Sequence, residues 1–351
     1  ISYAYMENGR IVVVSSTQIP HIVRRVIGQA LGIPWGKIRV IKPYIGGGFG
    51  NKQDVLYEPL NAFLTTQVGG RPVKLDVTRE ETFCNTRTRH SIEYDLTAGV
   101  DNEGHLLAKD MLAISNQGAY ASHGHAIAAN GLTAWRLQYA CQNIKGEAYT
   151  VYTNTPVGGA MRGYGIPQVC FAIECFMDDI AKEIGMDPLE FRKKNCMRPG
   201  YEDPHTHVKC NTYGLMECME KGRRFIHWDE KRREYENQTG PIRKGIGMAI
   251  FCYKTGVYPI SLETAACRMV LNQDGSMQLS MGATEIGQGA DTVFTQMAAE
   301  VTGITADKVN VLSTQDTDIT PFDTGAYESR PAYVSGMAVK KNGAIFKEKI
   351  L

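Results

Sequence analysis

Apolar and polar residues alternate in short runs at three places in the chain, and turn-forming residues separate the runs. The three segments are "ISYAYMENGRIVVVSS" (residues 1–16), "YDLTAGVDNEGHLLAKD" (94–110) and "CRMVLNQDGSMQLSM" (267–281). Each segment places Asn, Asp or Gly between two runs of strand-forming residues, which is the arrangement of a β-hairpin. The pattern therefore predicts three hairpins.

Helical periodicity alternates with these strand patterns. Between residues 167 and 184 one apolar stripe has the spacing of a helix face, and it consists of Val169, Ile173, Phe176, Ile180 and Ile184. Gly185 follows the stripe and is suited to end a helix. We therefore predict a helix over residues 167–184.

The chain also contains an internal echo. Residues 24–41, "RRVIGQALGIPWGKIRVI", resemble residues 294–312, "FTQMAAEVTGITADKVNVL": Gly32 matches Gly303, and Lys37 matches Lys308. Such self-similarity predicts two copies of a loop–helix–strand unit, although many α/β proteins repeat units of this kind. With the hairpins it predicts an α+β fold of two related halves. Because residues 197–245 are polar and rich in charge, we expect a first domain over residues 1–200, a connecting segment over 201–245 and the start of a second domain over 246–351.

Composition narrows the classes of protein. The 38 Lys and Arg residues nearly balance the 37 Asp and Glu residues, so no nucleic-acid or membrane surface is indicated. Nine cysteines without a C-x-x-C pair are typical of reduced thiols in a cytoplasmic protein. The chain opens directly in a strand pattern and stops within a helical one, so we expect a partial chain.

Four loops are rich in small residues: residues 44–54 ("YIGGGFGNKQD"), 158–168 ("GGAMRGYGIPQ"), 282–292 ("GATEIGQGADT") and 324–330 ("TGAYESR"). The first fits neither a P-loop, because Asn51 precedes Lys52, nor the dinucleotide fingerprint, because Asn51 replaces its third glycine. Any one of them is explained by a tight turn before a helix. Four together predict backbone wrapped around a large polar ligand with phosphates, with helix N-termini facing the anion.

Five motifs in this order carry a family resemblance: "SSTQIPHIVR", "GGGFGNK", "AMRGYGIPQ", "GMDPLEFRKKN" and "TEIGQGADT". The chain resembles the molybdenum-binding subunit of the xanthine dehydrogenase and aldehyde oxidase family, and bacterial xanthine dehydrogenases most of all. The resemblance implies molybdopterin-binding domains with mixed sheets and packed helices. It also implies a molybdenum–molybdopterin cofactor, with the cytosine dinucleotide form among the options.

The implied reaction is hydroxylation of a purine (xanthine or hypoxanthine) with oxygen from water. Electrons would pass to iron–sulfur clusters and FAD on other subunits or domains, so the implied partners are these subunits and the remainder of the molybdenum subunit. The alternatives are a hydroxylase of another N-heterocycle or of an aldehyde, and a non-catalytic paralogue that only binds the cofactor.

The resemblance also assigns roles to residues. In this family the pterin's sulfurs hold the metal, so the protein need not supply Cys or His ligands. The family pattern places Gln18, Phe49 and Arg162 nearest the molybdenum. They would act mostly through their backbone or without coordinating the metal directly. The full set of implied cofactor-binding residues is Gln18, Gly48, Phe49, Gly50, Met161, Arg162, Gly287, Gln288, Gly289, Ala326 and Ser329.

Three residues match substrate positions of the family: Gln53, Tyr164 and Tyr258. Gln53 stands where animal purine-oxidising enzymes carry a glutamate, and Asn130 falls near their substrate-orienting arginine. For both tyrosines ordinary core packing is the alternative. The family's catalytic glutamate belongs to a Gly-Glu-Pro-Pro motif that does not occur in these 351 residues, so we expect no catalytic residue in this chain and no activity from the chain alone.

Overall fold

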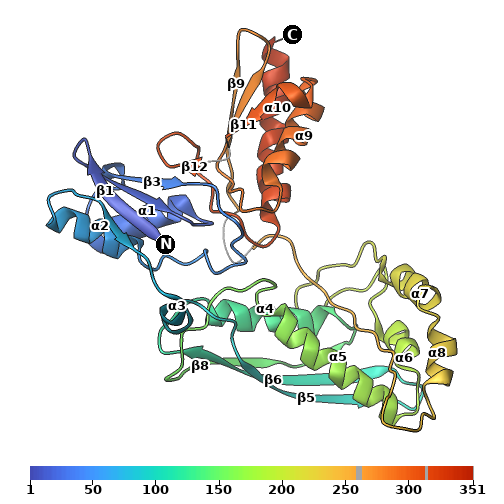
Figure 1. The fold of residues 1–351 in the computed structure, drawn as a ribbon. Helices are drawn as coiled ribbons and strands as arrows, with labels where there is room; N and C mark the ends of the chain where they lie inside the picture. Colours follow the sequence, from blue (N-terminus) through green and yellow to red (C-terminus); the bar gives the residue numbers. More distant parts are fainter. Residues whose placement is uncertain (258–262, 313–314, 351) are drawn as a thin grey trace. The chain divides into compact units, whose positions relative to one another are not determined.

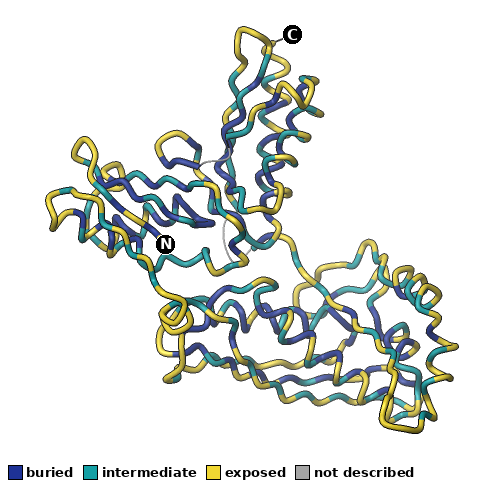
Figure 2. The backbone as a smooth tube through the Cα atoms, viewed as in Figure 1, coloured by how far each residue is buried: buried dark blue, intermediate teal, exposed yellow. Residues whose placement is uncertain are grey.

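The computed structural model describes residues 1–257, 263–312 and 315–350, which form two compact units. Unit 1 comprises Ile1–Arg89, Gly159–Arg162 and Lys254–Leu351, and unit 2 comprises His90–Gly158 and Gly163–Tyr253. The second glycine loop is therefore divided between the units. In each unit the buried residues gather along the strands and the inward helix faces (Figure 2). The predicted division at residues 200 and 246 stays a prediction.

Unit 1 contains a five-stranded sheet in the order β12-β3-β2-β1-β4. Neighbouring strands are antiparallel except β2 and β3. Helices α1 and α2 pack against this sheet, and the core between them contains Ile11, Val13, Val23 and Ile38. The elements are β1 (Ser2–Glu7), β2 (Arg10–Ser15), α1 (Pro20–Leu31), a 3-10 turn (Trp35–Lys37), β3 (Ile38–Lys42), α2 (Glu58–Gln67), β4 (Val73–Leu75), α3 (Arg79–Asn85) and β12 (Gln315–Asp316).

A three-stranded sheet, in the order β11-β10-β9, forms the rest of unit 1. Helices α9 and α10 lie side by side along it (Figure 1). Met277, Leu279, Phe294 and Val339 belong to the core that the helices cover. The elements are β9 (Cys267–Leu271), β10 (Met277–Met281), α9 (Ala290–Thr302), a 3-10 turn (Ala306–Lys308), β11 (Val309–Val311), a π-helical turn (Pro331–Ser335) and α10 (Gly336–Ile350).

The two halves of unit 1 repeat one topology, as the sequence echo predicts. In each half an antiparallel hairpin leads into a helix, a 3-10 turn and a strand that pairs parallel with the second hairpin strand. Both helices end at a glycine in the left-handed region, with φ of 65° at Gly32 and 82° at Gly303. Glycine adopts this conformation without the steric cost of a Cβ atom, which explains why both copies keep it.

Unit 2 is a four-stranded sheet with helices α4 and α5 on one face (Figure 1). Its long hairpin of β5 and β6 and its helix α5 confirm two further predictions, and the five residues of the predicted stripe pack in the core of this unit. The elements are β5 (Ile92–Val100), β6 (Leu106–Gly118), α4 (Gly124–Leu137), β7 (Asn143–Ile144), β8 (Glu147–Tyr152), α5 (Ile166–Glu183), α6 (Pro188–Asn195), α7 (Leu215–Phe225) and α8 (Trp228–Glu234). Within the described residues, no helix has the length and apolar character needed to cross a membrane.

Candidate functional site

Gln18 joins two of the small-residue loops in unit 1. The residue follows β2 and is only 2% exposed. Its side-chain Oε1 accepts a hydrogen bond from the backbone N–H of Gly50 (3.0 Å), and its Nε2 donates to the carbonyl of Ala326 (2.6 Å). Its backbone accepts from the N–H of Ala326 and donates to the carbonyl of Lys52. Loops from opposite ends of the chain thus meet at one buried carboxamide.

Glycines at this meeting point allow backbones to approach closely. A Cβ atom on Gly48 would lie 2.7 Å from Cδ of Gln18, and one on Gly50 would lie 2.9 Å from the carbonyl carbon of Ala160. Gly50 also has a φ of 98°, and Gly325 has a φ of 126°. Real Cβ atoms essentially never come this close to other atoms. The predicted cofactor residues Gly48 and Gly50 therefore have a structural reason to be glycine.

Phe49 and Arg162 come together in the same part of unit 1. The backbone N–H of Arg162 donates to the carbonyl of Phe49 (2.8 Å), and its guanidinium lies 6.0 Å from the centre of the Phe49 ring. Phe49 is 56% exposed and has a φ of 55°, which is uncommon for a residue other than glycine. Met161, next to Arg162, is half-buried.

The loop at residues 284–291 adjoins the first glycine loop, because the N–H of Gly47 donates to the carbonyl of Ile286 (2.7 Å). Gly287, Gln288 and Gly289 are exposed. The Gln288 side chain is bonded to its own loop: Oε1 accepts from the N–H of Ile286 (2.7 Å), and Nε2 donates to the carbonyl of Thr284 (3.0 Å). The predicted cofactor residues of this loop thus present mainly backbone.

The expectation that helix N-termini face a phosphate stays a prediction, and two of the chain's own carboxylates already bond N–H groups beside two of the loops. The carboxylate of Glu285 accepts hydrogen bonds from the N–H groups of Gly287, Gly289 and Asp291 at the start of α9. Burial alone would raise the pKa of Glu285, but these hydrogen bonds lower it overall. At α2 the carboxylate of Glu58 accepts from the N–H groups of residues 56 and 57. Residues 56 and 57 precede α2, whereas Asp291 lies in the first turn of α9.

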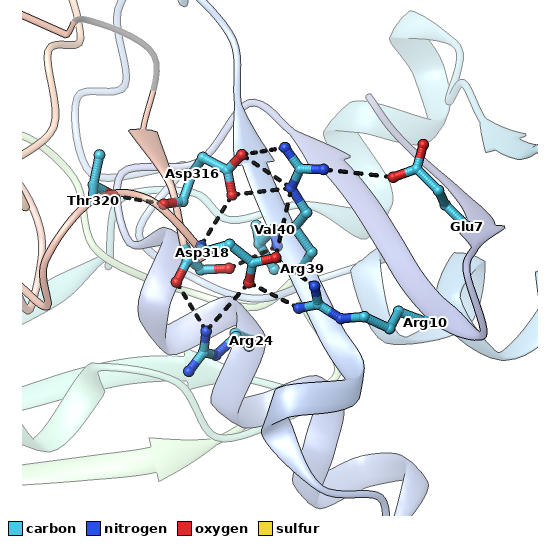
Figure 3. Close-up of polar contacts among 9 residues, drawn as sticks. Glu7, Arg10, Arg24, Arg39, Val40, Asp316, Asp318 and Thr320 are labelled. Carbon is cyan, nitrogen blue, oxygen red and sulfur yellow. Dashed lines mark hydrogen bonds and ion pairs between the residues drawn. The ribbon is translucent and has the colours of Figure 1, made fainter.

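A cluster of charged residues attaches the segment of residues 315–320 to the first sheet (Figure 3). The Nε–H of Arg39 is shared between the two carboxylate oxygens of Asp316, and Nη2 donates a further hydrogen bond to Asp316 (2.5 Å). Arg10 forms a two-pronged pair with Asp318 (2.6 and 2.8 Å), and Arg24 donates to the carbonyl of Thr317. These contacts hold β12 at the edge of the sheet, and the chain then continues to the loop at Ala326.

The loop that follows has a strained backbone. Glu328 and Ser329 have φ angles of 45° and 55°, and Ser329 is exposed. Arg330 is fully buried and pairs with Asp323 (2.5 Å) and Glu263 (2.6 Å). Burial raises the pKa of Glu328 to about 7, and its Oε2 is buried without a hydrogen-bond partner among the described residues. Left-handed backbone at residues with a Cβ persists only where the surroundings hold it.

The three predicted substrate residues have different outcomes. Gln53 is half-buried, and its backbone N–H donates to the carbonyl of Gly50 (3.0 Å). It precedes the first residue of α2, Glu58, by five positions and so does not cap that helix. Tyr164 belongs to unit 2. Tyr258 lies outside the described residues.

Sequence reasoning missed several residues that shape this site, namely Glu285, Arg39, Asp316 and Arg330. Glu285 had a usable signal, because an acidic residue just before a Gly-x-Gly loop can fold back onto the loop's N–H groups. The partners of Arg39 and Arg330 lie far along the chain, and a single sequence does not reveal them. Within the described ranges no group of three or more His, Cys, Asp or Glu side chains is placed to hold a metal ion.

Comparisons with known proteins show what the chain is similar to. Residues 1–196 and 221–351 each match a family described as molybdopterin cofactor-binding domain. The whole chain is 51% identical to the xanthine dehydrogenase molybdenum-binding subunit of Escherichia coli O157:H7, of which it covers 47%. Over 64% of its length it is 36% identical to the nicotinate dehydrogenase large molybdopterin subunit of Eubacterium barkeri, covering 52% of that protein.

Among solved structures, the aldehyde oxidoreductase of Desulfovibrio desulfuricans superimposes with a TM-score of 0.88 at 29% identity. The match covers 97% of this chain and 37% of that one. The chain thus spans about half the length or less of the relatives that it matches. The α+β fold with mixed sheets that the resemblance implied is confirmed.

Proposed function

Because the chain belongs to the molybdopterin cofactor-binding proteins of the xanthine dehydrogenase family, we propose that it binds the molybdenum cofactor in a longer enzyme that hydroxylates a purine such as xanthine or hypoxanthine. The meeting of the small-residue loops around Gln18 carries this proposal. The high identity with a xanthine dehydrogenase subunit over the entire chain supports it.

The residues of unit 1 fit such a cofactor. The loop at residues 287–289 is exposed, and its two glycines let a polar ligand approach the backbone closely. Phe49 is exposed as well. The buried hydroxyl of Thr284, at the base of the same loop, has no hydrogen-bond partner among the described residues. When bound, the cofactor supplies the redox centre. Gln18 Nε2 carries two hydrogens and gives one to Ala326, so the second remains to donate to the cofactor.

The remaining implied residues complete the proposed cofactor site. Met161 and Arg162 contribute backbone on one side, and Ser329 contributes on another. Iron–sulfur and FAD subunits, and the rest of the molybdenum subunit with the catalytic glutamate, act as partners. Residues 1–351 alone are then inactive. All nine cysteines are free thiols, which supports our proposal that the protein works in the reducing cytoplasm.

We propose that Gln53 and Tyr164 contact the substrate, with Tyr258 as a further candidate. The carboxamide of Gln53 is both a donor and an acceptor, so it suits the nitrogen and oxygen atoms on the edge of a purine. Another N-heterocycle is the second candidate, because a nicotinate dehydrogenase subunit is 36% identical to this chain.

Metal and pterin analysis of the full-length protein tests the cofactor proposal. We expect about one molybdenum and one pterin per chain, and turnover of xanthine or hypoxanthine in the assembled enzyme. Folded, fully assembled protein without molybdenum or pterin would overturn the proposal.

The Gln53→Ala variant tests the substrate. It should lower kcat/KM for the purine several-fold, about one hydrogen bond's worth, and leave aldehyde turnover unchanged. Gln67→Ala, at the exposed end of α2, is the matched control. An unchanged ratio of purine to aldehyde activity in Gln53→Ala would favour the other N-heterocycle.

A further inference from the structure

Tyr164 stands in an unusual turn of unit 2, directly before α5. Three successive residues have positive φ angles: Gly163 at 93°, Tyr164 at 49° and Gly165 at 92°. A Cβ atom on Gly165 would lie 2.6 Å from the backbone carbonyl oxygen of Ile127 in α4. The turn is thus pressed against α4, and the one residue in it with a side chain is held in the left-handed region. Such strain persists where surrounding contacts fix the residue, and it is common at functional sites.

Two side chains bond Tyr164, one at its backbone carbonyl and one at its hydroxyl. They come from α4 and from the N-cap residue of that helix. Asn130, which is 4% exposed, donates from Nδ2 to the backbone carbonyl of Tyr164 (2.8 Å). His123, the residue before α4, places Nδ1 at 2.7 Å from the Tyr164 hydroxyl. The two rings also meet edge to face, with centroids 5.6 Å apart and an interplanar angle of 79°. A phenol hydroxyl can donate or accept, so the pair forms a hydrogen bond with either tautomer of the histidine.

We propose that His123 is a positioning residue that fixes the orientation of the Tyr164 ring for a flat heteroaromatic substrate. The proposal rests on the function proposed above, in which Tyr164 contacts the substrate. Stacking depends on the angle and offset of the two rings. A tyrosine with only its Cα anchored can turn about two side-chain bonds, whereas one bonded at the hydroxyl as well has a single orientation. The preorganised ring lowers the entropy lost when the substrate binds. Loss of His123 should therefore raise KM and leave kcat nearly unchanged.

Asn130 has a related role. Its amide is buried and bonded to the carbonyl of Tyr164. It therefore supports the strained turn. The ring of Tyr164, oriented by His123, then provides recognition of the flat face of the substrate.

The test uses the full-length assembled enzyme with whichever heterocycle the wild type hydroxylates, xanthine first. His123→Ala should raise KM roughly fivefold, as the loss of about one hydrogen bond predicts, with kcat changed less than twofold. His123→Asn should restore most of the wild-type KM, because its Oδ1 can take the place of Nδ1 as an acceptor. In a Tyr164→Phe background, His123→Ala should raise KM much less, since the hydrogen bond to the hydroxyl is already gone and only the edge-to-face ring contact remains. His125→Ala, an exposed histidine two residues away, is the matched control.

The outcomes separate this inference from the proposed function. A wild-type enzyme without molybdenum or without heterocycle turnover contradicts the proposed function and this inference with it. An active wild type whose KM is the same in His123→Ala overturns only the role of His123. A His123→Ala enzyme that loses kcat and thermal stability without a change in KM also overturns it, because that result describes a structural role. Equal effects of His123→Ala with and without the Tyr164 hydroxyl would do the same.

Discussion

Replacing Gly48 with alanine should destabilise unit 1 through Gln18 alone. The added methyl group would lie 2.7 Å from Cδ and 2.8 Å from Cγ of Gln18, and closer still to Oε1. Gln18 is 2% exposed, and both polar atoms of its side chain are bonded, one to Gly50 and the other to Ala326. The carboxamide therefore has to move to make room, and both hydrogen bonds break. Gly48 does not have a positive φ, so backbone strain does not contribute.

The expected loss follows from those two hydrogen bonds. Each contributes about 0.5–1.5 kcal/mol net, and a buried donor or acceptor left without a partner costs about 1–3 kcal/mol. We expect Gly48→Ala to lower the free energy of unfolding by about 2–4 kcal/mol. Gln18→Ala should cost a similar amount, because it removes the same bonds. In that shortened background the methyl group added at position 48 has room, so Gly48→Ala should cost about 0.5 kcal/mol or less.

Urea denaturation and the thermal midpoint of the full-length protein, prepared without cofactor, measure this double-mutant cycle. Gly46→Ala is the matched control two residues earlier, because a Cβ there meets nothing within 4 Å and its φ is not positive. It should change stability by at most about 0.5 kcal/mol. If Gly48→Ala is equally costly with and without the Gln18 side chain, or if Gly46→Ala is as costly, contact with Gln18 is not the cause and the reasoning fails.

Two further predictions concern buried charges. Arg192→Met should destabilise unit 2 by about 3–5 kcal/mol, because Glu174, bonded at 2.8 Å to the fully buried guanidinium of Arg192, would lose its counter-ion. Thermal unfolding measures this loss, with the exposed Arg198→Met as the control. Equal unfolding midpoints for the two variants would contradict the prediction. Glu328→Gln should change the pH dependence of stability. Burial raises the pKa of Glu328 from its usual 4.5 to about 7, so the folded wild type binds a proton that the unfolded chain releases in this range, and its stability falls as pH rises through it. The variant lacks this pH dependence, so its stability relative to the wild type should rise between pH 5 and pH 8. Melting temperatures measured across this pH range test it, and a constant difference between the two proteins would refute it.

Much of the local structure followed from the sequence. Asn, Asp and Gly between strand-forming runs predicted the three hairpins, and a single apolar stripe predicted α5. The echo between residues 24–41 and 294–312 predicted the repeated loop–helix–strand unit with its matched glycines, and the structure shows these glycines ending α1 and α9 in the left-handed region. These features depend on periodicity and turn chemistry within about twenty residues, which a single sequence displays.

The assignment of functional residues depended on motif resemblance, and the structure added what the motifs omit. Gln18, Gly50 and Ala326 were all proposed as cofactor residues, but their hydrogen bonds to one another were not predicted. Glu285 was overlooked, and its carboxylate occupies the N–H groups that an anion was expected to use. A glycine-rich loop allows either outcome, because the same bare backbone serves a ligand or a neighbouring side chain.

The sequence by itself determined which segments become strands, helices and glycine loops, and which family they belong to. Only the tertiary structure decided that β12 (Gln315–Asp316) forms an edge of the first sheet, next to the ion pairs of Arg39 and Arg10. It also decided that Ala326 meets Gln18, 308 positions away. The reason is physical. Local elements form from interactions between residues close together in the sequence. The contacts that build the site join residues far apart in the sequence, which meet only when the whole chain has folded.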